Sequence, residues 1–364
     1  MLFRRFIASG AAIGLLLAAA VPVAAGAPNP AGPRPDNSYL VTELVTGPGS
    51  DPDLVNAWGL TRSPTSPWWV ANNGTDSTTL YRGDGSKVQS GAVPARVGIP
   101  DGAPTGAAFN GVSSDFDGDV FLFDGESGII FGWQGAFTLT GDAQIRNDDH
   151  AGDAVYKGLA VGTADVGDGA QQYLYATDFH NGRIDVFDHT YASQTWAGAF
   201  HDPDLPRGYA PFGIANLNGT LFVSYALTQQ GSDDERAGQG RGAVDAFATD
   251  GSFLGRVATH GGLNAPWGLA WAPADFGRFS NDLIVGNFGD GKLHAFRWNG
   301  KDWHPDGTLT DSTDEPIAVD GLWAIQFGGG VNVTNDGEAN ALYYTAGPDD
   351  ESAGAFGTIT ATNP

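Results

Sequence analysis

The side chains of this sequence best suited to chemistry are carboxylates, amides and a histidine that stand beside short apolar runs. They occupy two recurring positions, one next to a glycine-containing apolar segment and one after the following apolar run. The first position holds Asn56, Thr105, Lys157, Phe212 and Asp320, and the second holds Asn72, Asn73, Asp124, Glu126, Asp178, His180, Tyr225, Asn287 and Asp290. Their oxygens suit Ca²⁺ or Mg²⁺, and a site with a histidine could also hold Zn²⁺ or Mn²⁺. Asn and Asp at strand ends also commonly bond the backbone of turns, which is the alternative explanation.

Several other chemistries lack their residues. The sequence has no Gly-x-Ser-x-Gly elbow, no His-Glu-x-x-His pair and no cysteine nucleophile. The glycine-rich stretch Gly231–Gly242 has no Lys-Ser/Thr pair and no helical pattern after it, so it is not a nucleotide-binding loop. This polar insertion is either a mobile lid over a ligand or a solvated loop.

The chemistry-bearing positions recur because the chain repeats one pattern six times. The clearest copies are Leu54-Val55-Asn56-Ala57-Trp58-Gly59-Leu60 and Leu263-Asn264-Ala265-Pro266-Trp267-Gly268-Leu269. The anchor residues of the copies lie 47 to 56 residues apart, at Gly59, Gly106, Gly158, Gly213, Gly268 and Ala324. That spacing is typical of a four-stranded blade with its loops. We therefore predict an all-β fold, a single six-bladed β-propeller.

The propeller prediction places the residues named above. Glycine is expected at the anchors because the innermost strands approach one another closely around the central channel. The last copy is one strand short, so residues 39–45 are expected to complete it and close the ring. Loops that enter the inner strands and loops that follow the second strands meet at one face. We expect a ligand there, at the mouth of the channel.

The N-terminal segment and the composition indicate in which compartment the protein works and which partners it binds. Arg4 and Arg5 precede an apolar run that ends near Ala20, and Ala25-Gly26-Ala27 has the form that signal peptidase cleaves. We predict a signal peptide over 1–27, a flexible lead-in over 28–38, the propeller over 39–364, and a secreted or extracytoplasmic protein. Without cysteines, stability must come from a large core. The formal net charge of -24 argues against nucleic acid or membrane partners, and we expect a monomer that binds a small-molecule or carbohydrate-like ligand.

Several segments resemble an uncharacterised family of exported bacterial six-bladed propeller proteins. The resemblance rests on Pro266-Trp267-Gly268-Leu269, on Gly286-Asn287-Phe288-Gly289-Asp290-Gly291 and on Gly321-Leu322-Trp323-Ala324. The architecture is also distantly similar to gluconolactonase-like and NHL-repeat propellers. The lactonase-like group holds a cation with Glu, Asn and Asp side chains, and this likeness implies a possible metal set of Asn72, Glu126, Asp178 and Asn287.

Two functions follow from these observations. The leading hypothesis is a secreted propeller that binds a small or extended ligand at the channel mouth, with or without Ca²⁺ or another divalent cation. The alternative is a metal-dependent hydrolase or lyase of lactonase type, with Glu126 or Asp178 as general base. Trp58, Trp267 and Trp323 are expected to pack the blades, although tryptophans at equivalent places could also form a platform for a sugar.

Overall fold

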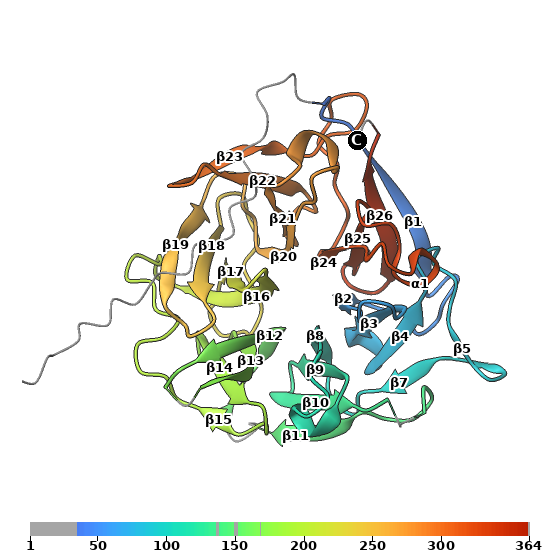
Figure 1. Cartoon of the computed structure of the whole chain (residues 1–364). Helices are drawn as coiled ribbons and strands as arrows, with labels where there is room; N and C mark the ends of the chain where they lie inside the picture. The colour runs from blue at the N-terminus through green and yellow to red at the C-terminus, as the bar shows by residue number, and fades with distance from the viewer. Residues whose placement is uncertain (1–34, 136–137, 149–151, 168, 363–364) are drawn as a thin grey trace, which may run out of the picture.

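Six small antiparallel sheets stand in a ring around a central channel in the computed structural model (Figure 1). The structure describes residues 35–135, 138–148, 152–167 and 169–362. The expected signal peptide and most of the expected lead-in lie outside these residues, so both stay predictions. Each blade has four strands, which confirms the six-bladed β-propeller. Within the described ranges, no helix has the length and apolar character needed to cross a membrane.

The blades follow one another along the chain, each running from the inner strand to the outer strand. The strands of the first three blades are β2 (Ala57–Thr61), β3 (Trp68–Asn72), β4 (Ser77–Tyr81) and β7 (Arg96–Gly98); β8 (Pro104–Phe109), β9 (Phe121–Gly125), β10 (Ile129–Trp133) and β11 (Gln144–Asp148); and β12 (Tyr156–Asp165), β13 (Ala170–Asp178), β14 (Arg183–Asp188) and β15 (Ser193–Gln194). A short pair, β5 (Gln89–Ser90) and β6 (Val93–Pro94), precedes β7.

The second half of the ring repeats this order. Its strands are β16 (Tyr209–Leu217), β17 (Thr220–Leu227), β18 (Gly242–Ala248) and β19 (Phe253–Thr259); β20 (Pro266–Trp271), β21 (Leu283–Asn287), β22 (Leu293–Trp298) and β23 (Trp303–Thr308); and β24 (Leu322–Phe327), β25 (Leu342–Ala346), β26 (Gly354–Ala361) and β1 (Tyr39–Gly47). The short helix α1 (Val333–Asp336) lies between β24 and β25.

The six predicted anchors all lie in inner strands, where neighbouring backbones almost touch. A Cβ added at Gly213 would lie 2.2 Å from the carbonyl oxygen of Trp267 in the next blade. At Gly59 the corresponding distance to the Thr105 carbonyl oxygen is 2.5 Å. Both separations are too short for any side chain, which explains the glycines physically.

The core is distributed between the blades. Trp69 of β3 stacks on Phe121 of β9 with ring centroids 4.3 Å apart, and Phe131 of β10 is buried in the same cluster. Similar apolar clusters fill the other contacts between neighbouring sheets. Strand alternation therefore directs large side chains toward the adjacent blades, and the fold has no need of disulfides.

The N-terminal strand closes the ring, as predicted. β1 pairs antiparallel with β26, from Tyr39 opposite Ala361 to Gly47 opposite Gly354. The first and last strands of the chain thus share one blade, and their pairing leaves no open sheet edge where the ring closes.

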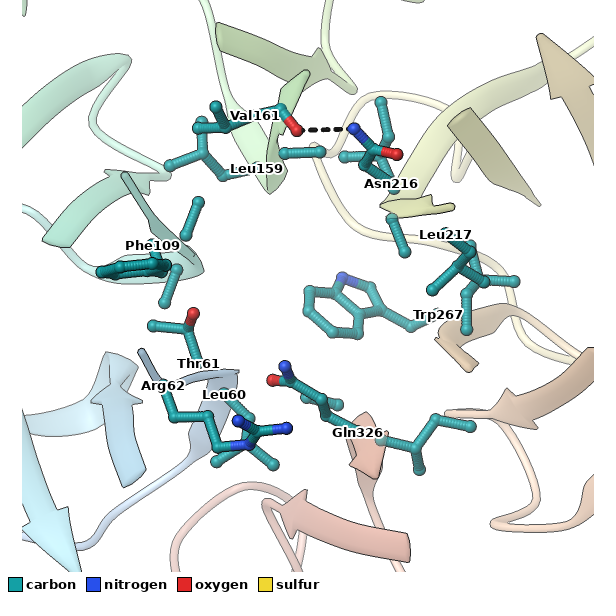
Figure 2. A pocket seen from close by; sticks show the side chains of 18 residues that line it. Leu60, Thr61, Arg62, Phe109, Leu159, Val161, Asn216, Leu217, Trp267 and Gln326 are labelled. Atoms are coloured by element: carbon teal, nitrogen blue, oxygen red, sulfur yellow. Dashed lines mark hydrogen bonds between the residues drawn. The ribbon is translucent and has the colours of Figure 1, made fainter. Parts of the chain in front are cut away.

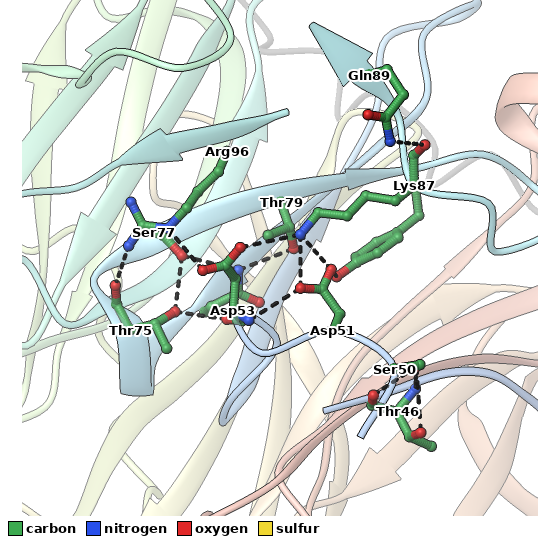
Figure 3. Close-up of polar contacts among 12 residues, drawn as sticks. Thr46, Ser50, Asp51, Asp53, Thr75, Ser77, Thr79, Lys87, Gln89 and Arg96 are labelled. Atoms are coloured by element: carbon green, nitrogen blue, oxygen red, sulfur yellow. Dashed lines mark hydrogen bonds and ion pairs between the residues drawn. The ribbon is translucent and has the colours of Figure 1, made fainter. Parts of the chain in front are cut away.

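Charged side chains connect the segment that follows β1 to the outer part of the first blade (Figure 3). Lys87 lies 2.6 Å from Asp51 and 3.1 Å from Asp53, and Arg96 lies 3.1 Å from Asp53. The Tyr81 hydroxyl donates a hydrogen bond of 2.6 Å to the Asp51 carboxylate, which is only 3% exposed. We call these five residues the closure network. Its two aspartates and two cations balance, so the segment after β1 is fixed against the first blade.

Candidate functional site at the channel mouth

Five of the six residues that precede the anchors meet through their side chains, and we call them the axial ring: Trp58, Lys157, Phe212, Trp267 and Trp323. The sixth, Thr105, is hydrogen-bonded to Asp124 and to the Tyr156 carbonyl oxygen instead. Trp58 and Trp323 stack with centroids 3.4 Å apart, and Trp58 meets Trp267 edge-on at 6.3 Å. These contacts join blades one, five and six, so the rings must meet near the axis. The expectation that the tryptophans serve packing is confirmed, because all three are at most 8% exposed.

Lys157 is the charged member of the axial ring, at the start of β12. Its side chain is 2% exposed, and its ammonium lies 5.2 Å from the centre of the Trp58 ring and 6.0 Å from that of Phe179. The ammonium forms an ion pair with Glu126 from the loop after β9. Aromatic faces and a carboxylate thus replace the water that a lysine normally requires.

Two amides connect the carboxylates around this lysine. Asn73 donates a hydrogen bond of 2.9 Å to Glu126, and Asn56 donates one of 3.1 Å to Glu351. Asn56 also bonds Asn73 and accepts a hydrogen bond of 3.0 Å from the Trp323 indole. The amides therefore hold two glutamates that come from the second and the last blade.

A third glutamate arrives from the Gly231–Gly242 insertion. Glu235 lies within electrostatic reach of Lys157, Glu126 and Glu351. We call Lys157, Glu126, Glu235, Glu351, Asn56 and Asn73 the mouth cluster. One cation faces three carboxylates in it, so the cluster carries excess negative charge.

The excess negative charge affects the pKa values of two of these carboxyl groups. Burial, with repulsion from Glu235 and Glu126, raises the pKa of Glu351 from 4.5 to about 7, although Lys157 opposes the change. Burial also raises the pKa of Glu235, and Lys157 again opposes this. A carboxyl that titrates near neutrality can exchange a proton or accept a cation.

The insertion that carries Glu235 is hydrogen-bonded to the neighbouring blade on each side. His180 Nδ1 lies 2.5 Å from Asp233, and the Gly238 backbone N–H donates a hydrogen bond of 2.5 Å to the Asn264 side chain. The hydrogen bond to Asp233 raises the pKa of His180, which favours the charged ring. The insertion thus connects loops of the third and fifth blades beside the mouth cluster.

The structure brings together only part of the residue set expected at the mouth. Asn56, Asn73, Glu126 and Lys157 meet in the mouth cluster. Tyr225 is buried against Asp245 within its blade, and Asp320 accepts a hydrogen bond of 3.1 Å from the Asp349 backbone on the exposed rim.

Three of the four candidate metal ligands bond within their own blades. Asn72 donates to Ser77 and Thr79, while Asp178 accepts from Asn181 and from the Val155 backbone. Asn287 donates to Asp290 and to the Gly262 carbonyl oxygen. Buried Asp124 likewise accepts from Thr105 and the Gly106 backbone. These contacts follow the alternative explanation, in which strand-end polar residues fix turns.

No group of three or more His, Asp or Glu side chains is arranged to hold a metal in the part of the chain that the structure describes. The proposed metal set therefore stays a prediction. In the mouth cluster, the Lys157 ammonium lies among the carboxylates that would be expected to attract a cation.

Sequence reasoning missed Glu351 and Glu235. Glu351 lies between β25 and β26, the position after a second strand, so the repeat register applied to the last blade would have found it. Glu235 lies in an insertion without a counterpart in the other copies, and no repeat could have placed it.

Comparisons with known proteins establish the fold but not a family. No family model matches the chain. Uncharacterized proteins R648 and L690 of Acanthamoeba polyphaga mimivirus are each 29% identical to it, over 91% of this chain and 82% and 88% of their own. These relatives are viral, whereas the sequence resemblance implied bacterial proteins.

Solved structures share the architecture at low sequence identity. The soluble aldose sugar dehydrogenase of Escherichia coli has a TM-score of 0.51 and 13% identity, and a glucose dehydrogenase has 0.53 and 14%. Each alignment covers 89% of this chain and 100% of the other. The chain is thus a six-bladed propeller similar to these proteins in fold.

Proposed function

We propose that the protein binds a small cationic ligand, such as an amine, at the mouth cluster. The observation that carries this proposal is the charge imbalance, in which Lys157 is the single cation among Glu126, Glu235 and Glu351. Such a site gains free energy from any added positive charge, because the neighbouring carboxylates otherwise repel one another or take up protons. The amides of Asn56 and Asn73 supply pre-oriented polar groups beside them.

The Gly231–Gly242 insertion acts as a lid in this proposal. It supplies Glu235, so the segment proposed to close the mouth would also complete the charge of the site. Opening it would separate Glu235 from the other carboxylates and admit the ligand. Closure with a bound cation would then be favoured by direct attraction to Glu235.

Calorimetric titration with Ca²⁺, Mn²⁺ and an alkylamine near pH 7 tests this function. A cation that displaces the proton of Glu351 should release protons, which appear as a dependence of the binding heat on the ionisation enthalpy of the buffer. Glu351→Gln should abolish that proton release and weaken binding about tenfold. The matched control is Glu43→Gln, since Glu43 is an exposed carboxylate on the outer strand β1. Absence of binding by every cation would contradict the proposal.

A second candidate function is hydrolysis of a lactone or ester. It is favoured by the pKa of Glu351 near 7, because a carboxylate of that strength can accept a proton from water while the adjacent Lys157 ammonium attracts the carbonyl oxygen. Water oxygen would then bond to the carbonyl carbon, and the ring C–O bond would break as the leaving oxygen regains the proton. A panel of aldonolactones and aryl esters tests it, with Glu351→Gln expected to lose all activity.

Export is part of the proposed function. The basic residues, the apolar run and the small residues at the start of the sequence support cleavage after Ala27. Expression of the full chain in a secreting host, with mass spectrometry of the mature N-terminus, tests this. Cell-associated protein that keeps Met1 would contradict it.

A further inference from the structure

A cavity in the central channel is lined by residues that lie farther along the inner strands than those of the mouth cluster (Figure 2). Its volume is about 300 Å³, and its wall includes the residue that follows each of the six anchors. Those residues are all apolar: Leu60, Ala107, Leu159, Ile214, Leu269 and Ile325. Trp267 of the axial ring extends into the cavity and forms its inner end. We call this cavity the distal chamber.

The distal chamber opens toward a groove of similar character. The groove has a volume of about 330 Å³ and adds Trp271 and Phe327 to the apolar surface, while it shares Leu269 and Ile325 with the chamber. Together the two spaces are large enough for a ligand of the size that small-molecule sites bind. A lining of this kind favours an elongated apolar body.

Polar groups gather on one side of the chamber. Thr61 and Arg62 from the end of β2 lie beside Gln326 from β24, and Figure 2 shows the Arg62 and Gln326 side chains near each other at the edge of the pocket. Asn216 lies on the other side, where its amide is already bonded to the Val161 carbonyl oxygen at 2.8 Å. The polar groups that remain available to a ligand therefore lie on the side of Arg62 and Gln326.

The partly buried guanidinium of Arg62 does not use all of its hydrogen-bond donors. Its terminal nitrogens donate to the carbonyl oxygens of Ser63 at 3.3 Å and Phe327 at 3.2 Å, and its buried Nε has no hydrogen-bond partner. Burial lowers the pKa of Arg62, while the nearby carboxylate of Asp336 opposes this. Asp336 is itself held by the Asn332 backbone, so it compensates the charge without occupying the donors of Arg62.

We infer that the distal chamber binds a small amphipathic carboxylate. The apolar body would lie along the six inner strands, and the carboxylate would accept hydrogen bonds from Arg62 and Gln326. A guanidinium offers a forked pair of donors that matches a carboxylate, and the apolar side chains of the inner strands give the rest of the ligand a surface to pack against. This site is separate from the proposed function at the mouth, because no residue of the mouth cluster lines the chamber.

The test compares two probes with the same apolar body, decanoate and decanol, by calorimetric titration of the full mature chain. The wild type should bind decanoate about tenfold more tightly than decanol. Arg62→Met should remove that preference and leave decanol binding unchanged. Equal affinity of the wild type for both probes would overturn the role of Arg62.

Filling the chamber distinguishes it from other sites. Ala215→Trp and, as a second variant, Ala107→Phe should each abolish binding of both probes, with circular dichroism and thermal melting showing which variants keep the fold. Lys157→Met should leave decanoate binding unchanged. Loss of decanoate binding in Lys157→Met, or its retention in a folded filling variant, would place the ligand elsewhere and overturn the inference.

Discussion

The closure network and the mouth cluster are built from the same kinds of side chain but differ in their balance of charge. Asp51 and Asp53 face two cations in the closure network, and each carboxylate has a direct partner. In the mouth cluster one ammonium faces three carboxylates, and the pKa of Glu351 rises to about 7. A network with equal numbers of positive and negative side chains stabilises the closure of the ring. A network with an excess of carboxylates instead has an affinity for protons or cations.

The largest effect is expected from breaking the balanced network. Asp51→Asn leaves Lys87 without its closest carboxylate and weakens the hydrogen bond from Tyr81. Because removing one partner of a buried pair leaves the other uncompensated, the variant should lose about 3 kcal/mol of unfolding free energy. Urea unfolding followed by fluorescence measures this. Cation binding at the mouth should be unchanged per folded molecule, and a loss of affinity would show that the two regions are coupled.

Removing the single cation of the mouth cluster should have the next largest effect. Lys157→Met keeps the length and packing of the side chain but leaves three glutamates without a counter-charge. At a pH well above the pKa of Glu351 the loss of stability should be about 2 kcal/mol, and well below it the loss should shrink because the carboxyls are protonated. Thermal unfolding at several pH values measures the difference. A pH-independent loss would indicate that Lys157 serves packing alone.

Glu351 itself should make stability depend on pH in a defined direction. Its folded pKa, about 7, lies above the value of 4.5 for an unperturbed Glu, so the folded state binds the proton more tightly. Stability should therefore fall as pH rises through this interval, by about 2 kcal/mol after allowance for partial exposure of the group.

Comparison of the wild type with Glu351→Gln isolates this contribution, since buried Asp124 and Asp245 also have a raised pKa of about 7. The wild-type curve should fall more steeply than that of the variant between the two pKa values. Parallel curves would mean that Glu351 does not titrate in the folded state in this range.

The smallest effect is expected at the tie between the insertion and the third blade. His180→Gln removes an exposed ion pair with Asp233, so global stability should change by less than about 0.5 kcal/mol. The insertion should nevertheless open more often, and trypsin should cleave after Arg236 faster than in the wild type. The rate in the wild type should also rise as pH increases through the raised pKa of His180. Identical cleavage rates of the wild type and the variant would show that the contact between His180 and Asp233 does not keep the insertion closed.

Much of the fold could be predicted because the repeat is encoded locally. The anchors at Gly59 and Gly213 and the alternation of apolar residues reflect backbone contacts that recur in every blade, so one copy explains another. Pairing of β1 with β26 was also predictable, because the last copy lacked a strand. The site was harder to predict. Glu351 was missed although the repeat register of the last blade could have placed it, and Glu235 lies in an insertion outside the repeat.

The sequence by itself determined six blades, their inner glycines and the closing strand, because these depend on short-range pattern and steric fit. Only the tertiary structure decided which strand-end residues meet. Asn72, Asp178 and Asn287 bond within their own blades, whereas Glu126, Glu235 and Glu351 converge on Lys157 from separate loops. The physical reason is that convergence depends on side-chain direction at the axis and on the path of long loops, and neither is fixed by local periodicity.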